Sequence, residues 1–173
     1  KFANFVTAEK RSQQRKKLRI AENEIVLLYV GRLNYVAKSN PLPLLIAAEQ
    51  VAASSTTPLR ILFNGYFNDE LNEKAFTQAT EVICKKTTVN FVQHGDPEFP
   101  HGVWAAGDIF CSLSDNIQES FGLTPLEAMS AGLPVIVSDW DGYRDTVRDG
   151  IEGIMIPTCM PAAGIGKEIA YRY

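Results

Sequence analysis

Two glutamates, Glu119 and Glu127, flank a segment whose main chain is suited to binding an anion. The segment leads into a predicted helix, and a helix N-terminus presents unpaired N–H groups at the positive end of the helix dipole. The amides near Phe121, Gly122 and Leu123 are therefore expected to bind phosphate. A carboxylate aimed at the same phosphate would repel it, so the two glutamates are better placed to accept hydrogen bonds from sugar hydroxyls. A nucleoside diphosphate sugar carries hydroxyls on both sides of its diphosphate.

The helix after this segment is predicted over residues 124–131. Thr124 is its expected N-cap, Pro125 fits its first position, and Glu127 follows the cap by three residues to complete a capping box. A role in the capping box alone is the alternative for Glu127. For Glu119, the alternative is an exposed acid in a loop.

Two cations lie in the loop that follows the first predicted strand. Gly31 is expected to form a tight turn there, and Arg32 and Lys38 lie between this turn and the next predicted helix. The planar guanidinium of arginine and the point charge of lysine would together neutralise a diphosphate without a metal ion. A surface loop with incidental charges is the alternative interpretation.

A third group of candidates, Gln93, His94 and Gly95, follows another predicted strand. The main chain at such a position could pair with the edge of a nucleotide base, and His94 could stack on it or donate a hydrogen bond. A structural turn is at least as well supported, because a lone histidine is weak evidence for catalysis.

These candidates are positioned by short apolar runs that alternate with helical patterns. Most runs are continuously apolar, as in strands that are covered on both faces. Strict alternation predicts right-handed crossovers and an α/β fold, a doubly wound, Rossmann-like, mostly parallel sheet with helices on both faces. In such sheets ligands bind at the carboxyl ends of the strands, where all three groups lie. Strands are expected over 24–30, 59–65, 89–94, 108–113, 134–139 and 153–157, and helices over 41–53, 69–84, 101–107, 124–131, 142–149 and 162–172.

The chain is expected to divide into a linker and lead-in helix, residues 1–23, and a nucleotide-sugar-binding domain, residues 24–173. The lead-in region is strongly basic over residues 9–19, which suggests a cationic strip for phosphates or membrane lipids; a solvated helix is the alternative. Because the first residue is Lys rather than Met, we expect a piece of a longer protein.

Composition limits the possible functions. The 173 residues are 46% hydrophobic and 21% charged, as in soluble globular proteins. A net charge of −3 and a pI near 5.4 argue against a nucleic-acid partner. The three cysteines are widely spaced and only two histidines are present, so we expect no zinc site and a reduced, cytoplasmic compartment. No apolar run approaches the roughly 18 to 20 residues that a membrane span needs.

Two nucleotide-binding motifs fail on inspection. The segment GIGKE, which ends at Glu168, lacks the Ser or Thr of a phosphate-binding P-loop. The first strand is not followed by the glycine fingerprint of dinucleotide-binding folds, which disfavours an NAD-dependent oxidoreductase.

Two segments resemble a known family. They are YVGRL, which begins at Tyr29, and DIFCSLSDNIQESFGLTPLEAMSAGLPVIVSDWDGYRDTVRDGIEGIMIPT, which begins at Asp108. Both resemble the C-terminal, donor-binding domain of retaining GT-B glycosyltransferases, in particular glycosyltransferase family 4, group 1 type. The likeness extends over residues 11–158 and is most specific over residues 108–157.

The resemblance implies a role for each candidate. Glu119 and Glu127, with seven intervening residues, match the acid pair of the family signature, so Glu119 would contact the transferred sugar and Glu127 the ribose hydroxyls. Arg32 and Lys38 would hold the diphosphate and stabilise the charge on the leaving nucleotide. With Glu119 they form the expected catalytic set. The expected donor-binding set is Gly31, Gln93, His94, Gly95, Phe121, Gly122, Leu123, Thr124 and Glu127.

The implied function is transfer of a hexosyl group from a UDP, GDP or ADP sugar to an acceptor hydroxyl, with retained anomeric configuration and neither metal nor cofactor. The acceptor, a glycan, lipid or small molecule, would bind to an N-terminal domain absent from this sequence, so the chain alone is expected to be inactive. The full-length protein could associate with membranes peripherally. A non-catalytic nucleotide-sugar-binding module and a sugar-nucleotide epimerase are the alternatives.

The sequence departs from the family at two places. The segment ILFNGYFND, residues 61–69, stands where relatives often have a glycine-rich loop with more acids. Trp140 and Asp141 stand where small residues are common, and they are expected to shape the choice of acceptor or sugar.

Overall fold

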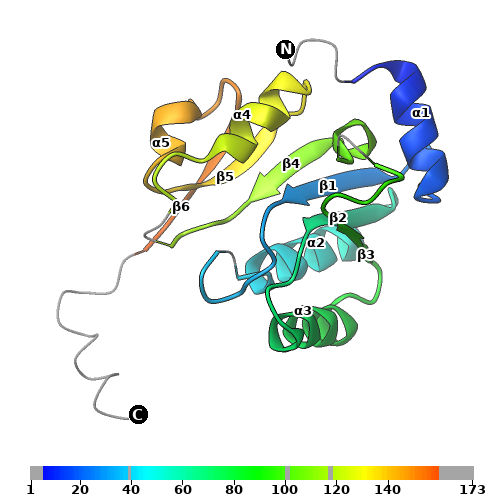
Figure 1. Cartoon of the computed structure of the whole chain (residues 1–173), viewed down its shortest axis with the longest axis horizontal. Coiled ribbons are helices and arrows are strands. Elements are labelled where there is room, and N and C mark those ends of the chain that lie inside the picture. Colours follow the sequence, from blue (N-terminus) through cyan, green and yellow to red (C-terminus); the bar gives the residue numbers. More distant parts are fainter. Residues whose placement is uncertain (1–5, 39, 100–101, 117–118, 160–173) are drawn as a thin grey trace.

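The computed structural model describes residues 6–38, 40–99, 102–116 and 119–159, which form the predicted α/β fold (Figure 1). All six predicted strands are confirmed, and they form one parallel sheet in the order β3-β2-β1-β4-β5-β6. From β1, the chain adds strands first toward one edge of the sheet (β2, β3) and then toward the other (β4, β5, β6). Doubly wound sheets bind ligands at this switch point, between β1 and β4. The elements are α1 (Ala8–Lys17), β1 (Ile25–Val30), α2 (Leu42–Ser54), β2 (Leu59–Gly65), α3 (Glu70–Ile83), β3 (Thr88–Gln93), η1 (Trp104–Ala106), β4 (Ile109–Ser112), α4 (Leu123–Ser130), β5 (Val135–Asp139), α5 (Tyr143–Thr146) and β6 (Gly153–Pro157).

Helices cover both faces of the sheet. In Figure 1, α4 and α5 lie on one face with α1 beside them, and α2 and α3 lie on the other. Strand β1 serves both cores, because Val26 and Leu28 belong to the cluster beneath α4 whereas Tyr29 belongs to the cluster beneath α2. This double burial explains why the strands read as continuous apolar runs.

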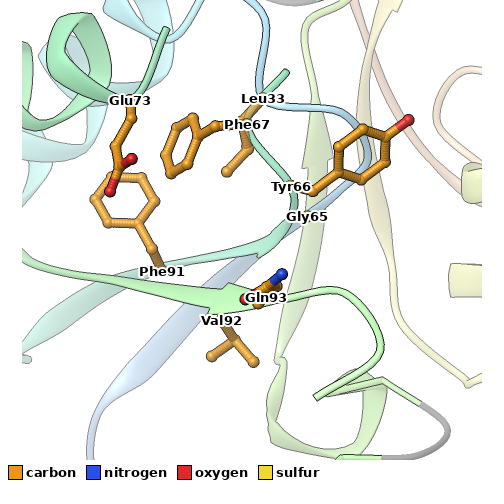
Figure 2. A pocket seen from close by; sticks show the side chains of 8 residues that line it. All are labelled: Leu33, Gly65, Tyr66, Phe67, Glu73, Phe91, Val92 and Gln93. Carbon is orange, nitrogen blue, oxygen red and sulfur yellow. The ribbon is translucent and has the colours of Figure 1, made fainter. Parts of the chain in front are cut away.

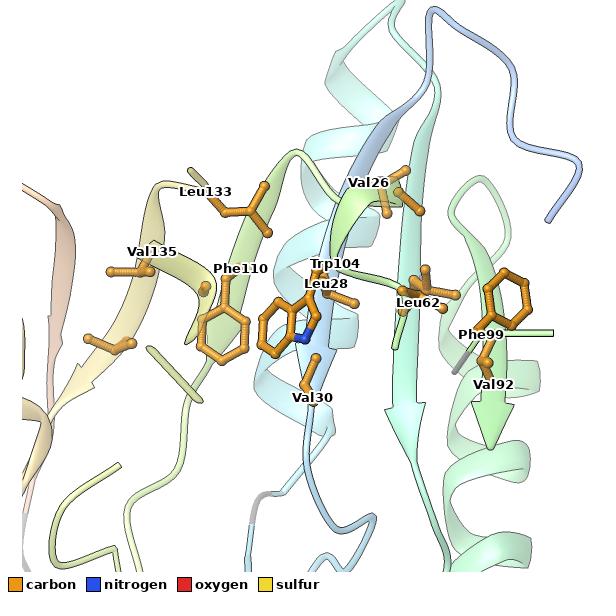
Figure 3. Packing of buried hydrophobic residues seen from close by; sticks show 14 of the residues in the cluster. Val26, Leu28, Val30, Leu62, Val92, Phe99, Trp104, Phe110, Leu133 and Val135 are labelled. Carbon is orange, nitrogen blue, oxygen red and sulfur yellow. The ribbon is translucent and has the colours of Figure 1, made fainter. Parts of the chain in front are cut away.

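Each core has an aromatic centre. In the core on the α4 side, Trp104 packs against Phe110 with their ring centroids 6.0 Å apart (Figure 3). In the core on the α2 side, Phe63 stacks on Phe91 at 5.3 Å and meets Phe76 edge-on at 5.7 Å. Such aromatic pairs stabilise the fold by about 0.5–1.5 kcal/mol each beyond the burial of their area.

The basic lead-in helix is fastened to the domain. Arg15 is buried and donates hydrogen bonds to the carbonyls of Ala21 at 2.6 Å and Glu24 at 2.7 Å. Arg11 and Arg15 also form ion pairs with Asp108, whose Oδ2 accepts from the Val26 amide at 2.8 Å. These two arginines therefore hold the structure together, so neither a strip for phosphates nor a fully solvated helix describes them.

Some predicted helices differ from the observed ones. The helix expected over 142–149 ends at Thr146, because Val147 adopts an extended conformation and is buried in the core. The one expected over 101–107 is the single turn η1, and the one expected over 162–172 lies outside the described residues. Within the described part of the chain, no helix has the length and hydropathy to cross a membrane.

Candidate functional site

The central contact of the site joins two predicted residues that lie 81 positions apart in the chain. The ammonium group of Lys38, in the β1–α2 loop, forms an ion pair with the carboxylate of Glu119, in the β4–α4 loop. The side chains are only 19% and 9% exposed. Glu119 is therefore not an exposed loop acid, and its charge is compensated by a cation, as a carboxylate this buried requires.

A cavity of about 290 Å³ lies at this contact. It brings Lys38 and Glu119 together with the predicted phosphate-binding segment. Among the described residues, Arg32 does not line this cavity. It is half-buried in the same loop as Lys38, and its carbonyl accepts a hydrogen bond from the Tyr29 hydroxyl at 3.0 Å. The cavity is lined by Lys38, Glu119, Ser120, Phe121, Gly122, Leu123 and Thr124.

The helix after this segment begins earlier than predicted. Its N-cap is Gly122, with φ +71°, and none of the side chains that the structure describes caps it. The predicted capping box of Thr124 and Glu127 is therefore wrong, because Thr124 lies inside the first turn and Glu127 lies beyond the capping positions. The N-terminus of α4 is thus left without a side-chain partner and faces the cavity through Gly122 and Leu123.

Glu127 lies near His94. Burial raises the pKa of the Glu127 carboxyl, and the charge of His94 opposes this shift. His94, in the turn after β3, therefore lies close enough to Glu127 in α4 for its charge to act on the carboxyl. With the capping box excluded, Glu127 is a half-buried acid whose carboxylate has no role in starting its helix.

The turn after β3 uses part of its main chain for structure. The amide of His94 donates to the carbonyl of Gly65 at 2.8 Å, and the amide of Asp96 donates to the carbonyl of Gln93 at 3.2 Å. Gly95 has φ +83°, which favours glycine. The structural-turn interpretation therefore holds for the His94 amide, while the side chains of Gln93 and His94 remain exposed.

A second cavity, of about 320 Å³, lies between the carboxyl ends of β2 and β3 and the start of α3 (Figure 2). Except for Gln93, sequence reasoning did not find its residues. The sequence signal that could have identified this cavity is the aromatic pair Tyr66 and Phe67, which lies within the segment that departs from the family. The lining residues are Leu33, Gly65, Tyr66, Phe67, Glu73, Phe91, Val92 and Gln93.

Sequence reasoning also missed Tyr143, a buried residue that packs against the cavity-lining segment on its core side. Its ring lies against Gly122, and its hydroxyl is 2.8 Å from Ser112 Oγ. Burial raises the pKa of Tyr143, and the negative charge of Glu119 and a hydrogen bond to it raise it further. Tyr143 therefore connects the Lys38–Glu119 pair to the buried end of β4.

The described residues contain no cluster of three or more histidines, cysteines or carboxylates suited to a metal ion. The groups that converge on the first cavity are instead a cation, a carboxylate and a helix N-terminus.

Comparison with known proteins gives matches over most of the sequence. The family profile described as glycosyl transferases group 1 matches residues 10–170. A D-inositol 3-phosphate glycosyltransferase of Rhodococcus erythropolis is 31% identical over 148 residues, which are 84% of this chain and 33% of that protein. The structure of HepE from Anabaena in complex with UDP-glucose has a TM-score of 0.70 at 22% identity, covering 96% of this chain and 42% of that one. WaaG, a glycosyltransferase involved in lipopolysaccharide biosynthesis, has a TM-score of 0.70 at 20% identity, covering 98% and 43%.

These matches have two consequences. The structural similarities establish a shared fold, and the chain spans 33% of the length of its relative from Rhodococcus. The family profile covers nearly the whole sequence. The resemblance to GT-B glycosyltransferases is thereby confirmed, and the chain belongs to the glycosyl transferases group 1 family.

Proposed function

We propose that this chain is the donor-binding domain of a retaining glycosyltransferase, which moves a hexosyl group from a nucleoside diphosphate sugar to an acceptor hydroxyl. The observation that carries the proposal is the Lys38–Glu119 ion pair, which lines the same cavity as the uncapped N-terminus of α4. A cation and a helix N-terminus suit a diphosphate, and a carboxylate suits the hydroxyls of an attached sugar. Family membership supports the proposal, as does the complex of HepE with UDP-glucose.

Lys38 exchanges partners in the proposed reaction. In the structure, its ammonium group is paired with Glu119. When the donor binds, the ammonium group turns to the phosphate oxygens, and Glu119 accepts hydrogen bonds from hydroxyls of the transferred sugar. The ion pair thus holds both groups beside the cavity.

The chemical step places negative charge on the leaving diphosphate. The bond from the anomeric carbon to the diphosphate breaks with oxocarbenium character. The acceptor hydroxyl attacks on the face that the diphosphate leaves, which retains the configuration, and its proton passes to a phosphate oxygen of the leaving group. Lys38 stabilises the charge on the leaving group together with the amides of Phe121, Gly122 and Leu123. Arg32, which lies in the same loop but does not line the cavity, is assigned the same role on the resemblance to the family. Loss of one such preorganised contact costs about 3 kcal/mol, on the order of a hundredfold in rate.

The nucleoside end of the donor is assigned to the other side of α4. Glu127 accepts hydrogen bonds from the ribose hydroxyls, and the turn of Gln93, His94 and Gly95 meets the base. The proximity of His94 to Glu127 supports this arrangement, because the ribose and the base must be bound side by side.

The complete enzyme is proposed to bind its acceptor, a glycan, lipid or small molecule, through a further domain and to act in the cytoplasm with peripheral membrane association. The proposed reaction needs neither a metal ion nor a cofactor, and the acidic sequence supports a partner other than nucleic acid.

A thermal-shift series on the 173-residue chain tests the proposal. UDP, GDP, ADP and NAD are added first, followed by the hexose conjugates of the nucleotides that stabilise the chain. A nucleotide at a hundred times its Kd should stabilise the fold by about 2.7 kcal/mol, which raises the Tm by several degrees. Stabilisation by NAD alone, or by none of these compounds, would contradict the proposal.

A pair of lysine variants makes the test specific. Lys38→Ala should reduce the shift produced by the nucleoside diphosphate sharply, with residual binding through the amides at the start of α4. Lys85→Ala removes an exposed lysine from the segment between α3 and β3. This segment lies at the amino ends of the strands, away from the site, so the shift should be unchanged. An equal loss in both variants would point to non-specific charge attraction.

A further inference from the structure

Three loops meet at Asn116, a residue to which sequence reasoning gave no role. Its side-chain amide donates to the carbonyl of Lys38 at 2.7 Å and to Ser114 Oγ at 2.9 Å. Its carbonyl accepts from the indole N–H of Trp140 at 2.9 Å and from the amide of Glu119 at 3.2 Å. Asn116 thus connects the loops that follow β1, β4 and β5.

A second hydroxyl holds the same Lys38 carbonyl. Ser114 Oγ donates to it, and Ser138 Oγ in turn donates to the carbonyl of Ser114. Ser114 and Ser138 are 0% and 2% exposed, so this anchor is part of the core. The carbonyl of Lys38 therefore accepts two hydrogen bonds, which is its full capacity.

Apart from these anchors, the β1–α2 loop is held by bonds to the β2–α3 loop and α3 and by local bonds near Lys38. The Leu33 amide donates to the carbonyl of Tyr66 at 2.9 Å, and the Tyr35 amide donates to Asn72 Oδ1 at 3.2 Å. Asn34 Oδ1 accepts from the amides of Val36 at 3.0 Å and Ala37 at 2.7 Å, and the Asn34 carbonyl accepts from the amide of Lys38 at 3.1 Å. These bonds shape the turn but do not tie its end to the β4–α4 loop. The lysine side chain is long and flexible, so the position of its ammonium group depends on where the Lys38 main chain is held.

The Glu119 side of the pair is held by the same group of residues. The Glu119 amide donates to Asn116, and the Glu119 carbonyl accepts from the amide of Gly142 at 3.1 Å. Gly142 lies two residues after Trp140, whose indole holds Asn116. One set of hydrogen bonds thus fixes the main chains of both members of the ion pair.

We propose that Asn116 is a positioning residue that holds the main chain of Lys38 beside Glu119, and that Trp140 holds Asn116 in place. This inference rests on the proposed function for its consequence in donor binding. Trp140 then acts through its N–H group, which explains a large side chain at a position where small residues are common.

Two uncharged substitutions test the proposal. Asn116→Ala removes both donated hydrogen bonds, and Trp140→Phe removes the indole N–H while keeping an aromatic ring. Asn23→Ala is the matched control, because Asn23 is exposed and precedes β1 at the amino ends of the strands, away from the site. Circular dichroism establishes that each variant is folded, and Trp140→Phe serves if Asn116→Ala does not fold.

The first measurement needs no nucleotide. Hydrogen exchange by mass spectrometry should be faster in a peptide covering residues 33–38 in Asn116→Ala and Trp140→Phe. Exchange in this peptide should be unchanged in Asn23→Ala, and peptides from β2 and β3 should be unchanged in all three variants. Unchanged exchange of residues 33–38 in both test variants would overturn the inference.

The second measurement is a double-mutant cycle in which calorimetry measures the binding of UDP, GDP and ADP to each variant. Loss of one such hydrogen bond should weaken binding about three- to tenfold. In the Lys38→Ala background the same substitutions should have almost no further effect, because they act through Lys38. An undiminished loss in that background would show a general structural role and overturn the inference. If none of the nucleotides binds the unsubstituted chain, the proposed function fails and hydrogen exchange alone decides the positioning role.

Discussion

The ring of Tyr143 occupies the space beside Gly122, where a Cβ atom would lie 2.4 Å from both Cδ1 and Cε1 of that ring. Gly122 also has φ +71°, a conformation that costs other residues roughly 1–2 kcal/mol. The start of α4 is therefore set by a side chain from α5.

This relationship predicts that Gly122→Ala destabilises the chain by about 2–5 kcal/mol, the sum of backbone strain and overpacking. Gly132→Ala, just after the other end of α4, is the control: it has φ +80° but nothing within 4 Å of the added Cβ. It should cost only the strain. Urea unfolding of both variants gives the two free energies, and equal losses would mean that Tyr143 yields to the added methyl group.

Glu119→Gln should strengthen binding of the free nucleoside diphosphate while abolishing transfer in the full-length enzyme. In the unsubstituted chain the diphosphate competes with Glu119 for Lys38, and the amide removes this competition. The fold should lose stability, because the partly buried Lys38 is left without its counter-charge. Calorimetry with UDP, GDP and ADP measures the affinity, and weaker binding in the variant would contradict the exchange of partners.

Glu127 predicts a pH dependence of stability. Burial raises the pKa of this carboxyl above its ordinary value of 4.5, so the folded state holds its proton to a higher pH than the unfolded state does. Its contribution to stability is full below pH 4.5 and is lost as pH rises through the pKa of the folded state. Glu127→Gln should therefore gain stability relative to the original chain as pH rises from 4 to 8. Tm measured across this range checks the sign, and parallel curves would argue against it.

The three cysteines should differ in reactivity. Cys111 is buried, which raises its pKa to about 12, whereas Cys159 is exposed and Cys84 is half-buried with a raised pKa. Because the thiolate is the reactive form, a disulfide reagent at pH 8 should modify Cys159 quickly, Cys84 slowly and Cys111 only after unfolding. Mass spectrometry of the labelled peptides gives the order. Rapid labelling of Cys111 in the native chain would contradict its burial.

The sequence predicted the sheet well because burial on both faces leaves a simple pattern. The run from Ile25 to Val30 is apolar throughout, and both cores need it. The convergence of the loops of Lys38 and Glu119 was predictable for a related reason: both follow strands that such a fold places side by side. The ion pair between the two side chains was not predicted. Each prediction depended on local composition and on one rule of topology.

The start of α4 could not be predicted in the same way. Thr124, Pro125 and Glu127 form a good local capping pattern, but the contact between Gly122 and Tyr143 moves the helix start. Asn116 is a single polar loop residue whose partners come from three loops, so no pattern along the chain identifies it. Long-range contacts of this kind are decided by tertiary packing.

The ion pairs that Arg11 and Arg15 of α1 form with Asp108 have a practical consequence for choosing expression boundaries. A truncation that starts the chain at Glu24 would delete Arg11 and Arg15, leaving the Asp108 carboxylate without its cations. It would also uncover the core where Ile20 now packs. Segments cloned to isolate this domain should therefore begin ahead of Ala8, even though the first strand starts at Ile25.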